Sequence, residues 1–421
     1  MTLRAFLVAI LVFLHGEVLA EPLREIAGVS PTLIIYSAKG AANSCGPGCD
    51  HWIAVEGTVD QAGASHINRF LREMKDARRP IYFNSPGGSE GQAFTIARML
   101  RTRAVVARVG RTIVTACAAG SQVDDACLKI KTSGVEVEAE ISTSRGMCNS
   151  ACTYMFFGAT TREVAPDATM AVHNARLAPV REASQEVIAA LRDRNMGQND
   201  LAQGSFLAAM GISHELEDLI ETVKFEDAHI LTRPELYRFG IDTRAMAETA
   251  WVLESGSRPY IRKIVVAKKG DGASFRTMQW RLFCEARGGA RLMFVREFDK
   301  DAAGTNSVVM MAGSEKTVAF GKLPVRVGIH EVWNGIIPSD VMKSLLTVSH
   351  LQMGEAVSTS DGKASETRFD IDTAGLEPAW AKLSASCPAA PGQPNATIGP
   401  SVAPEGKPAA PSAGLTSAHA P

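Results

Sequence analysis

The sequence predicts a layered α/β domain followed by a smaller, mainly β domain that is sandwich-like. Strand and helix patterns alternate between residues 32 and 110 of the 421-residue chain, which is typical of α/β domains with parallel strands. From about residue 260 the chain changes to short β runs separated by Gly, Asp and Asn turns. A chain of this length can bury the cores of two or three domains.

Hydrophobic periodicity predicts the first half of the α/β domain. Apolar residues at helical spacing, among them Ile67, Phe70 and Leu71, predict a helix over 62–77. A glycine-rich turn at 85–91 ends a buried strand and precedes a second helical pattern. We expect strands at 32–38, 51–60, 80–84 and 104–110, and the second helix at 91–103.

The second half of this domain begins with a looser pattern. Residues 112–147 predict an inserted loop or hairpin, held by Cys117 and Cys127. An apolar run at 151–159 predicts a buried helix, and a strand is expected at 168–175. Helices are then expected at 184–195, 201–211 and 214–223, and we place the whole domain at 31–247.

The mainly β domain is placed at 258–387. Its strands are expected at 261–269, 276–286, 291–298, 306–313 and 316–322, and a helix at 376–387 closes it. Beyond it, residues 388–421 are rich in Pro and Ala and predict a disordered tail.

The first 20 residues predict a secretory signal peptide. Arg4 supplies the positive charge, residues 5–14 form an apolar core, and Val18 and Ala20 match the small-residue pattern before a cleavage site. Residues 21–30 are then a linker. No later segment reaches the roughly 18 uninterrupted apolar residues of a membrane helix. We therefore expect an exported protein.

Export changes the interpretation of the eight cysteines, because disulfides are the rule in oxidising compartments. The simplest of many pairings is Cys45–Cys49, Cys117–Cys127, Cys148–Cys152 and Cys284–Cys387. The pair at 45 and 49 lacks the second pair or histidine of a zinc site, so no metal is expected. If Cys148 and Cys152 are bonded, neither is a thiolate, and Ser150 between them is the candidate nucleophile.

The net charge of −1 gives no basic field, which excludes nucleic acid as an expected partner. We expect no cofactor either.

Three features of the α/β domain occur in an order that suggests chemistry. Gly87 and Gly88 allow a turn whose N–H groups can face a ligand. Ser150 stands at a predicted helix start, where the N–H of Ala151 is free, and His173 stands at the end of the following strand. Each alone has a more ordinary explanation, as a turn, a helix cap or a surface histidine. Together they indicate a nucleophile, a base and an oxyanion site.

These residues carry a resemblance to a known family. The segment "IYFNSPGGSEGQAFTIARML", the serine among small residues and "ATMAVHNA" resemble the Clp protease proteolytic-subunit/crotonase superfamily over about residues 50–245. The resemblance implies a layered β-α spiral, with Ser150 as nucleophile and His173 as base. It also implies an oxyanion hole at Gly88 and Ala151, with Gly87 as a substrate-binding residue. Secreted bacterial Clp-like proteins share the Cys-x-Ser-Ala-Cys context, which implies the periplasm.

The third catalytic residue departs from the family pattern. Matching "PELYRFG" to the family places Ala228 where the family has an Asp, and Asp227 is one residue away. Glu226 and His229 are also close. We predict that Asp227 orients the catalytic histidine, and a Ser–His dyad remains an alternative.

We therefore predict an ATP-independent serine peptidase that acts on peptides or unfolded proteins. The sequence has no phosphate-binding loop and an exported protein meets no ATP, so no ATP-driven unfoldase is expected as partner. Assembly into a homo-oligomer is left open. The alternative is an inactive Clp-fold protein that binds a partner or the cell envelope. A crotonase-type acyl-thioester enzyme is a third class, which the absence of coenzyme A outside the cell disfavours.

Overall fold

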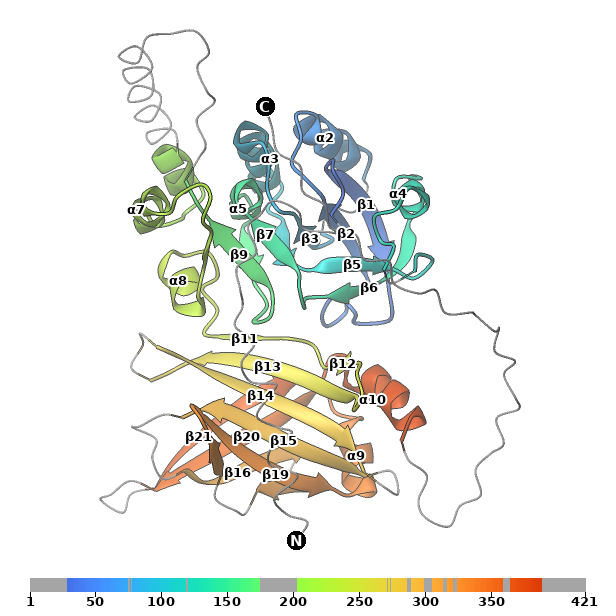
Figure 1. The fold of residues 1–421 in the computed structure, drawn as a ribbon, viewed down its shortest axis with the longest axis vertical. Helices are drawn as coiled ribbons and strands as arrows, with labels where there is room; N and C mark the ends of the chain where they lie inside the picture. Colours follow the sequence, from blue (N-terminus) through green and yellow to red (C-terminus); the bar gives the residue numbers. More distant parts are fainter. Residues whose placement is uncertain are drawn as a thin grey trace, which may run out of the picture.

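The computed structural model describes residues 29–174 and 203–387, apart from short gaps at 75, 77, 119, 271, 273, 286–288, 299–304, 313–315, 321–323 and 359–363. The predicted signal peptide at 1–20, most of the linker at 21–30, the helix at 184–195 and the tail at 388–421 lie outside the described residues. The described chain forms an α/β part above a β part in the view of Figure 1.

A mixed sheet of seven strands is the centre of the α/β part, in the order β5-β6-β1-β2-β3-β4-β8. Side chains of β2 alternate between two buried faces: Ile53 and Val55 belong to one core, Trp52 and Ala54 to another. The strands are β1 (Ile34–Lys39), β2 (His51–Glu56), β3 (Ile81–Asn84), β4 (Val106–Val109), β5 (Arg111–Val114), β6 (Val137–Ser142) and β8 (Thr161–Glu163).

The expectation of parallel strands is correct for only part of this sheet. β2, β3, β4 and β8 run parallel to one another, and β1 is parallel to β6. β1 is antiparallel to β2, and β5 is antiparallel to β6. The direct connection between β1 and β2 contains no helix, and two strands joined without a crossover pair antiparallel.

Three helices contribute to the larger core of the α/β part, on one side of the sheet (Figure 1). They are α2 (Gly63–Glu73), α3 (Glu90–Thr102) and α5 (Ala151–Phe157). All seven residues of α5 are buried, as its continuous apolar run predicts. This core holds the helix that follows Ser150 rigidly in place.

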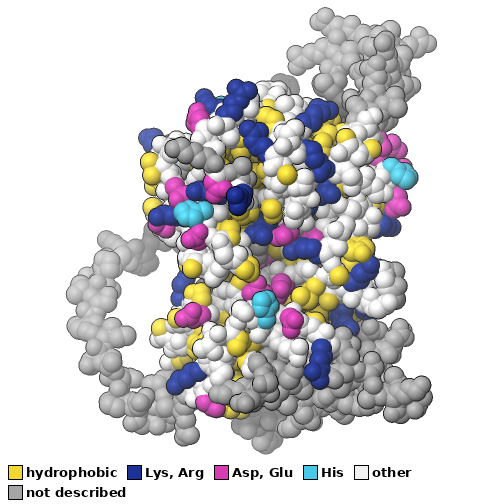
Figure 2. Space-filling model, turned by 180° about the vertical axis from the view of Figure 1, so that it is seen from behind, with side chains coloured by type: hydrophobic (Ala, Val, Ile, Leu, Met, Phe, Trp, Pro, Cys, Tyr) yellow, Lys and Arg dark blue, Asp and Glu magenta, His cyan; other side chains and the backbone are white. Residues whose placement is uncertain are grey.

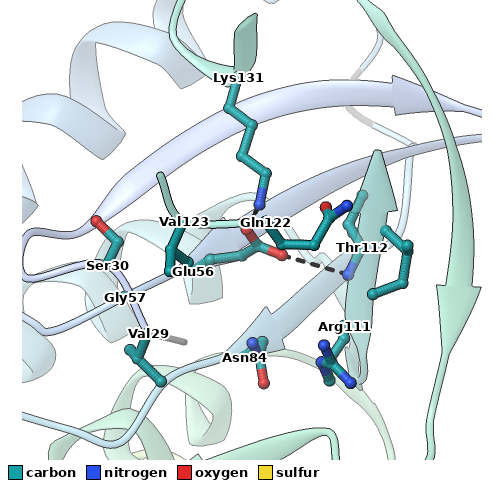
Figure 3. Close-up of a pocket in the computed structure, with 11 residues that line it drawn as sticks. Val29, Ser30, Glu56, Gly57, Asn84, Arg111, Thr112, Gln122, Val123 and Lys131 are labelled. Carbon is teal, nitrogen blue, oxygen red and sulfur yellow. Dashed lines mark hydrogen bonds and ion pairs between the residues drawn. The ribbon is translucent and has the colours of Figure 1, made fainter. Parts of the chain in front are cut away.

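The predicted insertion at 112–147 is more ordered than a loop. β5 and β6 flank helix α4 (Asp125–Lys131), and their side chains pack on the second face of the sheet. Lys131 at the end of α4 forms a buried ion pair of 2.8 Å with Glu56 at the end of β2. Figure 3 shows this pair, with Glu56 also accepting from the N–H of Thr112. The adjoining cavity of about 20 Å³ has room for about one water molecule, so this cluster is structural.

A second, three-stranded sheet has the order β10-β9-β7. β7 (Met147–Asn149) is parallel to β9 (Thr169–Val172), and β10 (His229–Ile230) pairs antiparallel with β9. Residues 203–209 are helical, and α7 (Glu215–Thr222) and α8 (Arg233–Arg238) follow. This small sheet brings residues near 150 and 173 together.

The β part consists of two antiparallel sheets that share one core. Trp280 and Phe294 come from the first sheet, and Met310 and Leu351 from the second. The first sheet contains β11 (Met246–Glu248), β12 (Val252–Glu254), β13 (Tyr260–Lys268), β14 (Phe275–Cys284), β15 (Ala290–Glu297), β18 (Val325–Val327) and β19 (His330–Ile337). The second contains β16 (Thr305–Ala312), β17 (Lys316–Phe320), β20 (His350–Ser358) and β21 (Ala364–Asp372), and the helices are α9 (Ser339–Leu345) and α10 (Leu376–Ala385).

The two parts are in direct contact. Arg262 on β13 is buried and bonds Glu254 within the β part and Asp167 in the α/β part, at 2.7 and 2.8 Å. Asp167 lies in the turn that leads into β9. On the face shown in Figure 2, acidic and basic side chains occur over both parts.

All eight cysteines lie in the described residues, and the four predicted pairs are at disulfide distance. Their Cα–Cα separations are 5.0 Å for Cys45–Cys49, 5.6 Å for Cys117–Cys127, 5.1 Å for Cys148–Cys152 and 5.8 Å for Cys284–Cys387. Such pairs are typical of proteins outside the cytoplasm. None of the described helices has the length and apolar character needed to cross a membrane.

Candidate active site

Ser150 occupies the sharp turn between β7 and α5. Its φ of 53° and ψ of −126° lie in a region that L residues rarely adopt, which costs about 1–3 kcal/mol. The surroundings hold it there: its N–H donates to Ala171 O at 2.8 Å, and its carbonyl accepts from the N–H of Thr153 at 2.9 Å. A strained strand-to-helix turn is the geometry that exposes a nucleophilic serine in α/β hydrolases.

The hydroxyl of Ser150 does not cap the helix. Helix-starting serines commonly accept a hydrogen bond from a backbone N–H of the first turn, but Ser150 makes no such bond. Within the described part of the chain its Oγ has no hydrogen-bond partner. The ordinary explanation of this serine as a helix cap is therefore wrong.

The disulfide beside the serine lies on the core side of the turn. Cys148 and Cys152 are both completely buried. Neither lines the pocket that Ser150 faces. The Cys148–Cys152 disulfide therefore lies between the turn and the core, and it does not cover the Ser150 hydroxyl on the pocket side.

A glycine turn packs against the same serine. Ser85 bonds β7 on both sides, by Ser85 N–H to Met147 O at 2.8 Å and Asn149 N–H to Ser85 O at 3.0 Å. Gly87 then has a φ of +107°, and a Cβ there would lie 2.7 Å from the carbonyl oxygen of Asn149 and from Ser150 Cβ. Only glycine permits this approach.

Two backbone N–H groups at this point are without acceptors among the described residues. Gly88, with a φ of +140°, is held by its neighbours, since Val59 N–H donates to Gly87 O and Ser89 N–H donates to Val59 O. Its own N–H has no acceptor, and neither has that of Ala151, the first residue of α5. Both residues line the pocket beside Ser150.

His173 reaches this pocket from the end of β9. The pairing of Asn149 with Ala171 and the bond from Ser150 N–H to Ala171 O place the serine and the histidine on adjacent strand ends. His173 Nδ1 is 2.7 Å from Asn174 O, and its ring packs edge-on against Phe225 with 4.9 Å between centroids. Because a carbonyl only accepts, Nδ1 carries the proton and Nε2 is free to accept another. No hydrogen bond joins His173 to Ser150 within the described residues.

The structure does not bring Asp227 to the histidine. Its side chain is exposed, and among the described residues no hydrogen bond links it to His173. β10 pairs His229 with Val172, so the same register places Ala228 opposite His173. His229 bonds Glu235 instead, at 3.0 Å. The partner of the imidazole is the carbonyl of Asn174, a backbone group that no side-chain motif can reveal.

The pocket has a volume of about 300 Å³. Its lining includes two side chains that the sequence analysis did not single out, Glu90 at the start of α3 and Tyr154 on α5. Burial raises the pKa of Glu90, and burial followed by the nearby charge of Glu90 raises that of Tyr154. In the sequence, only the position of Glu90 two residues after Gly88 points to the pocket, and an acidic residue at that position is also common at a helix start.

In the part of the chain that the structure describes, no group of three or more His, Cys, Asp or Glu side chains could hold a metal ion.

Comparisons with known proteins find distant structural similarity only. No family model and no curated protein matches the chain. Among solved structures it is similar to invasion-associated protein B from Bartonella henselae, with 11% identity and a TM-score of 0.26 over 32% of this chain and 92% of that one. It is also similar to a mutant of the 1510-N membrane-bound stomatin-specific protease, with 11% identity and a TM-score of 0.24 over 44% of this chain and 73% of that one. The similarity to these proteins is distant, and no residue's role follows from it.

Proposed function

We propose that this protein is an extracytoplasmic serine hydrolase that cleaves peptide bonds without ATP, on a Clp/crotonase-like α/β part. The observation that carries the proposal is the strained, uncapped Ser150, which shares a pocket with a histidine and with two backbone N–H groups that have no acceptor among the described residues. A structural serine needs neither the strain nor these neighbours. The four cysteine pairs support a site of action outside the cytoplasm.

The residues suggest roles in the order of an acyl transfer. Ser150 Oγ attacks the carbonyl carbon of the substrate while His173 Nε2 takes its proton. The N–H groups of Gly88 and Ala151 hold the oxyanion that forms. His173 then returns the proton to the leaving amine, and water repeats the sequence to release the acyl group.

We infer a dyad in which Asn174 takes over part of the role of an acid. Its carbonyl fixes the Nδ1–H tautomer that the base requires. A neutral carbonyl stabilises the imidazolium less than a carboxylate does, so turnover is expected to be slower than with a complete triad.

A fluorophosphonate probe tests this proposal, because it reacts with an activated serine irrespective of the substrate. The purified protein should be labelled, and Ser150→Ala and His173→Ala should abolish labelling. Ser133→Ala, at an exposed serine after α4, is the matched control and should be labelled as the unchanged protein is. Labelling that persists in Ser150→Ala would refute the nucleophile assignment.

The second candidate, an inactive binding protein, is favoured by the separation of Asp227 from His173. Absence of labelling in a folded protein would support it. Asp227→Asn and Glu226→Gln measure the role of the acid directly: a loss of labelling with the first only would establish Asp227 as the third residue. Equal labelling of both variants would support the dyad.

A further inference from the structure

Glu90 faces the pocket of Ser150 from the neighbouring helix. It is the first residue of α3, and Phe94 one turn later packs edge-on against Tyr154, with 5.1 Å between ring centroids. Glu90 and Tyr154 therefore stand on neighbouring helices, with Glu90 one turn before the contact of Phe94 with Tyr154. Both line the pocket together with Ser150.

The carboxyl of Glu90 has no partner in the described residues, neither a hydrogen bond nor an ion pair. Glu90 itself is half-buried, and two more deeply buried carboxylates of the described chain are compensated. Glu56 pairs with Lys131 at 2.8 Å, and Asp242 pairs with Arg244 at 2.6 Å. Although burial opposes its ionisation, hydrogen bonds and the charges of its arginine partners hold the pKa of Asp242 at about 2.

The position of Glu90 at a helix start offers an ordinary explanation, which is not sufficient. A helix N-terminus stabilises a carboxylate and lowers its pKa. The pKa of Glu90 is instead raised by burial. The carboxylate therefore destabilises its own surroundings at neutral pH, as groups retained for binding often do.

The described lining of the pocket has no positive side chain to neutralise this charge. Glu90 is the only carboxyl in it, and no Lys or Arg belongs to it. The other titratable side chains are His173 and Tyr154, and Tyr154 stays neutral because its pKa is raised. The hydroxyl of Tyr154 accepts from Gln203 Nε2 at 2.8 Å. Among the described lining residues, Glu90 is therefore an acidic side chain without a basic neighbour, beside the aromatic rings of Tyr154 and Phe225.

We propose that Glu90 binds a cationic group of the substrate, an ammonium or guanidinium, next to the bond that Ser150 attacks. This inference rests on the proposed function, because the bound cation is part of a substrate only if Ser150 cleaves the molecule that carries it. An incoming cation supplies the missing ion pair, while Tyr154 and Phe225 cover the apolar stem of a Lys or Arg side chain. The substrate class is therefore a peptide with a basic residue, or a free amino end, at the cleavage site.

Binding to the Ser150→Ala protein tests this without turnover. Calorimetry compares N-acetylated alanine peptides that carry Lys, Arg, norleucine or Glu at one central position. The Lys and Arg peptides should bind about tenfold more tightly than the uncharged norleucine peptide, as one charge-assisted hydrogen bond predicts. A norleucine peptide with a free amino end distinguishes the two sources of the cation, and tighter binding by either source supports the proposal.

Glu90→Gln, made in the same Ser150→Ala protein, keeps the shape and removes the charge, so it should abolish the preference. Glu73→Gln removes an exposed carboxyl at the end of α2 and should leave the preference unchanged. Equal affinities for the Lys and norleucine peptides, no binding by any peptide, or a preference that survives Glu90→Gln would overturn the proposal.

Cleavage by the protein with its serine intact separates the two proposals. Glu90-dependent binding with no Ser150-dependent cleavage would leave the cation site standing and refute the hydrolase. Ser150-dependent cleavage that does not distinguish Lys from norleucine would do the opposite.

Discussion

Replacing Gly87 with alanine tests whether the glycine turn and the serine form one site. The new Cβ would lie 2.7 Å from Asn149 O and from Ser150 Cβ, and 3.0 Å from Ala151 N. Ordinary van der Waals contact begins at 3.4 Å, so β7 and the glycine turn must separate by about 0.7 Å. That movement displaces the proposed nucleophile Ser150 and the proposed oxyanion donor Ala151 together.

The expected loss of activity follows from this displacement. A misplacement of about 1 Å costs roughly 10²-fold in rate, so the second-order rate of fluorophosphonate labelling should fall by about that factor. The left-handed backbone adds about 1–3 kcal/mol of destabilisation, which thermal unfolding measures.

Gly134→Ala is the matched control. Gly134 has a φ of +78°, and a Cβ there would meet nothing within 4 Å. This variant should lose similar stability and label at the normal rate. Normal labelling of a folded Gly87→Ala protein, or an equal loss in Gly134→Ala, would refute the coupling of turn and serine.

Three further changes have outcomes that the structure determines. Lys131→Met leaves Glu56 buried without a cation and should lower the free energy of unfolding by about 3–5 kcal/mol in urea, and adding Glu56→Gln should recover part of it; an unchanged midpoint would contradict the pairing. Folding raises the pKa of Glu90, so ionisation of this carboxyl destabilises the folded protein once the pH rises above the ordinary pKa of a glutamate. Glu90→Gln should therefore raise the Tm at neutral pH but not at a pH below that ordinary pKa. A lowered Tm at neutral pH would contradict a destabilising charge at Glu90. Replacing Cys148 and Cys152 with alanine should slow labelling, because the strained serine loses its covalent support; labelling at the normal rate would show that the hydrogen bonds suffice.

Local patterns predict much of the α/β part. The helix expected at 62–77 is found at Gly63–Glu73, and that at 91–103 at Glu90–Thr102. Ser150, Gly88 and His173 line one pocket, which their order along the chain suggested. These features depend on spacing and on short-range turn chemistry, which a single sequence contains.

The remaining features depend on contacts between distant residues. The antiparallel pairing of β1 with β2 is a matter of chain direction, which a strand pattern does not contain. β10 pairs His229 with Val172, and one more step of this register would place Ala228, not Asp227, opposite His173. His173 Nδ1 bonds the carbonyl of Asn174, and every residue has a carbonyl. Glu90 is a candidate binding residue because it has no hydrogen bond or ion pair among the described residues, and only the folded structure shows that.

The ion pair between Arg262 and Asp167 connects the β part to the turn before β9, the strand that ends next to His173. Asp167 begins the approach to β9, and β9 ends one residue before His173. A chain cut before β11 would lose Arg262 and leave the Asp167 carboxyl without its cation at the root of that strand. The β part therefore stabilises the turn that leads into the strand carrying His173, and we expect the α/β part alone to be less stable than the whole chain.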